Sequence, residues 1–143
     1  MFYPPFVCLT PVSSEAYDFV GGSQEGLYFL KKEKNWEITD RDEKSVKDVD
    51  ELIEFKNVLW GISSNSGLYQ YNKGSTKLYD IQDCNTLKIY KEQLVVTTDD
   101  GFYHYKSSND RFEQFEVWNK LLPANYQGIE NFYVADDSVW ILY

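Results

Sequence analysis

One motif recurs along the 143 residues of this chain and constrains its fold more than any other feature. In each copy a short apolar segment is followed by a glycine, an apolar residue and a tyrosine. The three copies contain Gly26-Leu27-Tyr28, Gly67-Leu68-Tyr69 and Gly101-Phe102-Tyr103, with Phe19, Trp60 and Leu94 seven positions before the glycines. A fourth copy begins at Val139-Trp140-Ile141. Repeats of about 40 to 50 residues built from short strands indicate the blades of a β-propeller.

Each copy divides into four short strands separated by turn-forming residues. The second unit shows this best, with strands predicted at 52–55, 58–63, 67–72 and 76–81. The third unit has them at 87–90, 94–98, 102–106 and 111–117, and the first at 6–9, 17–21, 27–31 and 36–39. Residues 44–55 also have apolar side chains at helical spacing, so a helix is the alternative for that segment.

The second strand of each unit is apolar at consecutive positions, which is typical of a strand buried on both faces. The sequence therefore predicts an all-β fold: a single partial β-propeller of about three and a half four-stranded antiparallel blades. The approximate blades are 1–43, 44–83, 84–119 and the incomplete 120–143. Because closed propellers have at least four blades, we expect this chain either to be part of a longer parent chain that supplies the remaining blades or to associate with another copy.

Composition and charge exclude several classes of protein. The chain has 23 acidic and 14 basic residues, for a net charge of −9, which disfavours nucleic acid as a partner. Its apolar runs fall far short of the roughly 20 residues that cross a bilayer, so we expect no membrane contact by this segment. Residues 1–10 contain two prolines and no basic residue, so they do not form a signal peptide.

The residues that could support chemistry are isolated or lie in predicted turns. Cys8 and Cys84 have no metal-ligand spacing, and His104 is the only histidine. The carboxylate pairs Asp99-Asp100 and Asp136-Asp137 fall where hairpin turns are expected. We therefore expect no catalytic residue, no metal and no cofactor, and predict that the chain is not an enzyme.

Aromatic side chains are the ambiguous case, because 12 Tyr, 9 Phe and 4 Trp could either fill the core or stack on sugars. Most recur at blade-core positions, but two flank the non-repeating segment 119–127. In a propeller, loops after a second or a fourth strand share one face. The hypothetical ligand face built from such loops comprises Trp118, Tyr126, Asn125, Asp83, Asn65 and Asp99.

The repeat resembles the two-component regulator propeller repeat. The resemblance rests on Leu122-Pro123-Ala124-Asn125, on Leu59-Trp60-Gly61-Ile62-Ser63 and on Gly67-Leu68-Tyr69-Gln70-Tyr71, and covers nearly the whole chain. It implies a non-catalytic, ligand-sensing segment on the periplasmic or extracellular side of a bacterial membrane sensor, often a hybrid histidine kinase that responds to carbohydrate. Any kinase activity would reside elsewhere, and a glycan is the implied ligand. The alternatives are a protein-interaction scaffold or a carbohydrate-active propeller enzyme.

Overall fold

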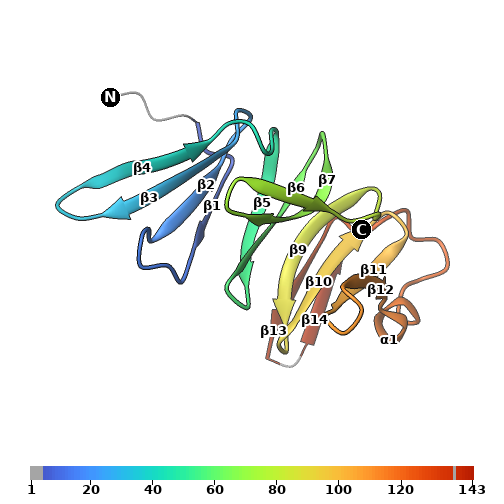
Figure 1. Ribbon diagram of the computed structural model, residues 1–143. Coiled ribbons are helices and arrows are strands. Elements are labelled where there is room, and N and C mark those ends of the chain that lie inside the picture. Colours follow the sequence, from blue (N-terminus) through green and yellow to red (C-terminus); the bar gives the residue numbers. More distant parts are fainter. Residues whose placement is uncertain (1–4, 137) are drawn as a thin grey trace. The chain divides into compact units, whose positions relative to one another are not determined.

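The computed structural model describes residues 5–136 and 138–143 and is nearly all-β (Figure 1). Three four-stranded antiparallel sheets follow one another along the chain, and a two-stranded sheet follows them. The first sheet contains β1 (Cys8–Pro11), β2 (Phe19–Gly22), β3 (Leu27–Lys32) and β4 (Trp36–Asp42). The second contains β5 (Val49–Phe55), β6 (Val58–Ser63), β7 (Gly67–Asn72) and β8 (Ser75–Leu78). The predicted all-β, blade-like architecture is confirmed.

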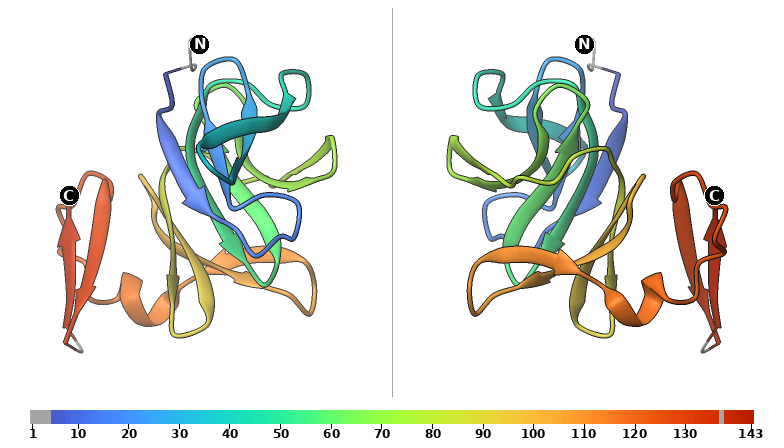
Figure 2. Two further views of the ribbon diagram at one scale, coloured as in Figure 1. Left: turned by 90° about the vertical axis from the view of Figure 1, so that its left-hand side faces the viewer. Right: turned by 90° about the vertical axis from the view of Figure 1, so that its right-hand side faces the viewer.

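The C-terminal part contains the third sheet, a short helix and a hairpin. The third sheet consists of β9 (Cys84–Tyr90), β10 (Gln93–Thr98), β11 (Gly101–Lys106) and β12 (Arg111–Gln114). The helical turn α1 (Glu116–Asn119) leads to the hairpin of β13 (Asn131–Ala135) and β14 (Ser138–Leu142), and Figure 2 shows this order from two sides. The chain forms two compact units, Met1–Leu78 (unit 1) and Tyr79–Tyr143 (unit 2), which are described separately.

Two local predictions are settled by these boundaries. Residues 49–55 of the segment with helical spacing form a strand, β5, in which every third side chain is buried. The strand predicted at 111–117 is wrong at its end, because β12 stops at Gln114. There the Phe115 amide donates to the Phe102 carbonyl, and Asn119 N donates to Phe115 O at 2.9 Å, which closes the helical turn α1.

Burial of the second strands agrees with the prediction that they are covered on both faces. Three or more consecutive residues are buried in β2, β6 and β10. In unit 1 the two sheets share a core that includes Val20, Leu27, Leu52 and Tyr69. In unit 2 the third sheet and the β13–β14 hairpin share an aromatic core made of Val95, Phe102, Trp118, Ile129 and Phe132.

A buried hydroxyl residue lies at the end of the second strand in each of the three complete sheets, as the last residue of β6 and of β10 and as the residue directly after β2. This residue explains how the repeat builds its turns. Ser23, Ser63 and Thr98 are at most 2% exposed. Each accepts a hydrogen bond from the backbone amide two residues later, at 3.0, 3.2 and 3.1 Å respectively. In both units the backbone carbonyl of this residue also binds the next sheet: Val49 N donates to Ser23 O, and Ile129 N donates to Thr98 O.

The strand pairing corrects the alignment of the repeats by one residue. Val20, Trp60 and Val95 each lie opposite the residue three places after the motif glycine. Trp60 therefore corresponds to Val20 and Val95, rather than to Phe19 and Leu94. The cause is the turn at 64–66, which has one residue more than its counterparts, and a one-residue shift moves a side chain to the other face of the sheet.

Candidate functional site

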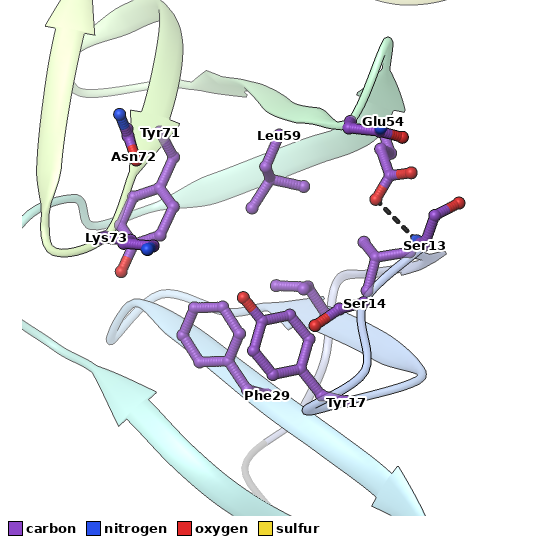
Figure 3. Close-up of a pocket in the computed structure, with 12 residues that line it drawn as sticks. Ser13, Ser14, Tyr17, Phe29, Glu54, Leu59, Tyr71, Asn72 and Lys73 are labelled. Atoms are coloured by element: carbon purple, nitrogen blue, oxygen red, sulfur yellow. Dashed lines mark hydrogen bonds between the residues drawn. The ribbon is translucent and has the colours of Figure 1, made fainter.

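Unit 1 contains a cleft between its two sheets, at the end where β1 joins β2 and β7 joins β8 (Figure 3). It consists of two adjoining hollows of about 230 and 560 Å³. Both hollows are lined by Ser14, Tyr17, Phe29, Tyr71 and Lys73. Since these residues come from both sheets, the cleft depends on the packing of one sheet against the other.

Three aromatic rings form the apolar wall of the cleft. The ring centroids of Tyr17 and Phe29 are 4.8 Å apart, and those of Phe29 and Tyr71 are 6.0 Å apart. Phe29 is buried, whereas the two tyrosines are half-buried and keep part of their rings accessible. An aromatic surface with polar groups around it suits a ligand that has both apolar faces and hydroxyl groups.

Opposite charges lie on the two sides of the cleft. Figure 3 places Glu54 beside Ser13 on one side and Lys73 beside Tyr71 on the other. One oxygen of the half-buried Glu54 carboxylate accepts a hydrogen bond of 2.8 Å from the Ser13 amide, which ties the β1–β2 loop to the second sheet. The cleft therefore offers an acceptor and a cationic donor at separate positions.

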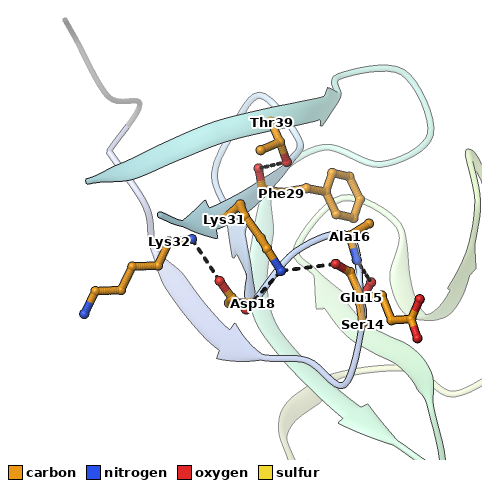
Figure 4. A network of polar contacts seen from close by, with 8 residues as sticks. All are labelled: Ser14, Glu15, Ala16, Asp18, Phe29, Lys31, Lys32 and Thr39. Carbon is orange, nitrogen blue, oxygen red and sulfur yellow. Dashed lines mark hydrogen bonds and ion pairs between the residues drawn. The ribbon is translucent and has the colours of Figure 1, made fainter. Parts of the chain in front are cut away.

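The β1–β2 loop, which carries Ser14 and Tyr17, is held by a polar network around Asp18 (Figure 4). The Lys31 ammonium lies 3.5 Å from the Asp18 carboxylate and donates to the Glu15 carbonyl at 3.1 Å. The Lys32 amide donates to the other Asp18 oxygen at 2.8 Å. This amide bond is the main reason why the pKa of Asp18 is lowered. The contacts stabilise the loop conformation that places Tyr17 at the cleft.

Asp42 stabilises the side of the cleft that carries Tyr71. It accepts hydrogen bonds from the Ser45 hydroxyl and amide, the Lys44 amide and the Tyr71 hydroxyl. The Tyr71 oxygen accepts in turn from the Gly74 amide at 2.9 Å. Desolvation raises the pKa of Asp42, but these hydrogen bonds outweigh it and lower the pKa to about 2. The orientation of Tyr71 therefore depends on an ionised Asp42.

This arrangement predicts a pH-dependent loss of stability. Because the folded-state pKa lies below the value of about 3.9 for an unfolded aspartate, ionised Asp42 stabilises unit 1 above that pH. The contribution is lost as the pH falls from about 4 towards 2. We expect Asp42→Asn to lower the unfolding temperature at pH 6 and to differ much less from the parent chain at pH 2.5. A difference that is constant with pH would contradict the role given to the carboxylate.

The hypothetical ligand face divides between the two units. Asn65 lies exposed in the β6–β7 turn of unit 1, whereas the other five residues belong to unit 2. Asp83 and Asn125 are exposed. Asp99 accepts a hydrogen bond of 3.0 Å from Asn85, whose amide also donates to the Ile129 carbonyl. The Tyr126 hydroxyl donates to the Asp100 carbonyl at 2.9 Å.

Trp118 is placed differently from the other members of that face. It is only 8% exposed, and its ring packs against those of Tyr90, Phe102, Phe115 and Phe132 at centroid distances of 4.8–5.4 Å. Asn119 fixes this placement, since its side chain accepts from Phe102 N and donates to Phe102 O. The structure thus presents Trp118 as a core residue of unit 2 rather than as an open platform.

Sequence reasoning did not find the cleft in unit 1. The face it considered is formed by loops after second and fourth strands, whereas the cleft lies at the opposite strand ends, at the β1–β2 and β7–β8 connections. Tyr71 belongs to the repeated motif and could have been noticed on that ground. Tyr17 lies in a connection that no other unit repeats, and no sequence signal marks it.

The remaining candidate groups are dispersed. In the described part of the chain, no three His, Cys, Asp or Glu side chains are grouped so that they could hold a metal ion. His104 stacks on Phe115 with ring centroids 4.6 Å apart, and desolvation lowers its pKa.

Both cysteines are free and half-buried, and burial raises the pKa of Cys8 to about 11 and that of Cys84 to about 12. Cys84 is the first residue of β9. Asp137 lies outside the described residues.

Comparison of the chain with protein-family models, with curated proteins and with solved structures finds no match. The class that the fold defines is an all-β protein built of propeller-like, four-stranded antiparallel blades. The family resemblance stays a prediction. No helix among residues 5–136 and 138–143 has the length and apolar character needed to cross a bilayer, and α1 has only four residues.

Proposed function

We propose that this chain is a non-catalytic, ligand-sensing propeller segment of a bacterial two-component sensor, on the periplasmic or extracellular side of the membrane. We further propose that a glycan binds in the unit 1 cleft. The observation that carries the ligand assignment is the wall of Tyr17, Phe29 and Tyr71 facing polar groups between two packed sheets. Sugar rings present apolar C–H faces to aromatic rings and hydroxyl groups to side chains such as Glu54 and Lys73.

The cleft also offers a route from binding to a change in structure. Its two walls belong to different sheets and are joined by the Ser13–Glu54 hydrogen bond, which links residues 41 positions apart. A ligand that contacts both walls favours the sheet arrangement in which both contacts are made, because it shifts the population towards the state it binds better. A sensing segment requires this coupling, whereas mere storage of a ligand does not.

A glycan-binding screen followed by variants at the cleft tests the ligand assignment. We expect a glycan from the screen to bind the parent chain and to lose about tenfold or more of its affinity on Tyr17→Ala or Lys73→Ala. Tyr17→Phe keeps the ring and should retain most of the affinity. Tyr126→Ala, on the face considered from the sequence, is the matched control and should have no effect.

The outcomes separate the two sites and the two parts of the proposal. Loss of binding with Tyr126→Ala but not with Tyr17→Ala would assign the ligand to the face in unit 2. No binding to any glycan would contradict the ligand class. In the parent protein, a transmembrane helix followed by a kinase core would support the sensor assignment, whereas an adjoining carbohydrate-active catalytic domain would contradict it.

A further inference from the structure

The smaller hollow of the unit 1 cleft, of about 230 Å³, is lined by two charged side chains, Glu54 and Lys73. They lie on opposite sides of it (Figure 3). One Glu54 oxygen accepts a hydrogen bond from the Ser13 amide at 2.8 Å. Within residues 5–136 and 138–143, no hydrogen bond or ion pair engages the Lys73 ammonium. The charge that this hollow leaves without a partner is therefore positive.

The other carboxylates of the cleft have donors of their own. Asp40 and Asp42 line the larger hollow. Asp42 accepts from two side-chain hydroxyl groups and two backbone amides. One Asp40 oxygen accepts from the Arg41 amide at 2.8 Å, and the Arg41 guanidinium lies 3.7 Å from the Glu43 carboxylate. These groups are thus engaged within the larger hollow and its rim.

The backbone that carries Lys73 is fixed by hydrogen bonds. Lys73 and Gly74 form the two-residue turn between β7 and β8, with φ values of 43° and 84°. Positive φ at both positions is typical of a type I′ hairpin turn. The Gly74 amide donates to the Tyr71 hydroxyl at 2.9 Å, and the Gly74 carbonyl accepts from the Ser45 hydroxyl at 2.7 Å. Because the turn is already ordered, less ordering is needed when Lys73 binds a ligand.

The size and the polar lining of the smaller hollow suit one sugar ring. Its volume lies below the roughly 300–1,000 Å³ of pockets for drug-sized ligands, and the adjoining hollow of about 560 Å³ gives space for the rest of a glycan. The side-chain amides of Asn57 and Asn72 line it as well, and each can both donate and accept. Asn72 directly precedes Lys73, so an amide and an ammonium group lie on the same side.

The unpartnered ammonium group distinguishes acidic from neutral sugars. A ring that packs against Tyr17 and Phe29 removes water from the hollow, and a charge that loses water without gaining a partner is costly. A neutral sugar offers Lys73 only hydroxyl groups. A carboxylate offers a full opposite charge and a charge-assisted hydrogen bond, which is roughly twice as strong as a neutral one. The hollow therefore favours a sugar that carries a carboxylate.

We propose that the smaller hollow binds a hexuronate residue of a glycan, with its carboxylate at Lys73 and its ring against Tyr17 and Phe29. The ring hydroxyl groups on the far side face Glu54. This inference rests on the proposed function, because it specifies which class of glycan occupies the cleft. Lys73 determines the specificity for acidic sugars, whereas the aromatic wall supplies affinity that acidic and neutral sugars share.

Sets of three methyl glycosides, titrated into the full chain, test the proposal. Each set contains the hexoside, the uronate and the uronamide of one sugar: glucose, galactose or mannose. The uronamide keeps the shape of the uronate without its charge. For at least one sugar we expect the uronate to bind at least tenfold more tightly than the other two compounds. The net charge of −9 opposes this order, so general electrostatic attraction does not produce it. Chemical-shift titration by NMR measures the affinities into the millimolar range.

Variants at two lysines separate the local contact from the change in net charge. Lys73→Ala should reduce the preference for the uronate to less than about twofold, and Lys73→Arg should keep it. Lys56→Ala is the matched control. Lys56 also has a positive φ, 51°, in a two-residue turn of the second sheet, but it lies outside both hollows. Its replacement should leave the preference unchanged.

The outcomes distinguish this inference from the proposed function. Equal affinities of uronate and uronamide, at a site that Tyr17→Ala abolishes, would overturn the inference and leave the glycan cleft in place. A preference for the uronate that survives Lys73→Ala, or that Lys56→Ala removes, would overturn the role of Lys73. Binding of none of the glycosides would contradict both the inference and the proposed ligand.

Discussion

Replacing Trp118 by alanine is expected to lower the free energy of unfolding of unit 2 by about 3–5 kcal/mol, the usual cost of removing a large aromatic side chain from a core. The ring is 8% exposed and contacts four other aromatic rings. Its removal leaves a cavity that Asn119 cannot fill, because the Asn119 side chain is engaged with the Phe102 backbone. Chemical denaturation followed by far-ultraviolet circular dichroism measures the change.

Trp140→Ala is the matched control within the same unit. Its side chain is 67% exposed, so we expect a change of less than about 1 kcal/mol. If Trp118→Ala left the stability unchanged and instead weakened glycan binding, the core role described here would be wrong and the sequence-derived ligand face would be supported. Trp118→Ala thus distinguishes a role of this side chain in core packing from a role in ligand binding.

Replacing Gly26 by alanine is expected to destabilise unit 1 by about 3 kcal/mol or more, through backbone strain combined with a steric clash. Gly26 has a φ of 147°. A Cβ at this position would lie 2.2 Å from the Asp42 carbonyl oxygen and 2.9 Å from the Glu43 Cα, and neither atom can rotate away. Thermal or denaturant unfolding of the variant measures the loss.

Gly74→Ala separates the effect of backbone strain from the effect of a steric clash at the added Cβ. Gly74 also has a positive φ, 84°, but the nearest atom to its Cβ position is an Asp42 carboxylate oxygen at 4.0 Å. We expect a loss of about 1 kcal/mol there, from the backbone conformation alone. Equal losses at the two glycines would show that the contact of Gly26 with the β4 end does not matter.

The repeat could be predicted from the sequence because its signals are local. Consecutive apolar residues in the second strands and glycine before the third strands are visible within windows of ten residues. The structure adds the reason for the hydroxyl residue between them: Ser23, Ser63 and Thr98 close the turn, and in both units the backbone at this position binds the next sheet. The extra turn residue at 64–66 shifted the alignment, since spacing alone cannot show where strands pair.

The candidate sites depended on information that spacing does not carry. Trp118 lies in a non-repeating connection. Whether such a ring faces solvent or the core depends on the two hydrogen bonds between the Asn119 side chain and the Phe102 backbone. The cleft in unit 1 joins Tyr17 to Tyr71, which are far apart in sequence and come from different sheets. Neither arrangement has a periodic signature.

The amino-acid sequence by itself determined the all-strand character, the four-strand unit and the burial of its second strands. These properties follow from side-chain alternation and turn chemistry between near neighbours in the chain. The tertiary structure alone decided which aromatic rings line a cleft and which fill a core. The Ser13–Glu54 and Asn85–Ile129 hydrogen bonds span 41 and 44 residues, and contacts over such distances exist only when sheets pack against one another.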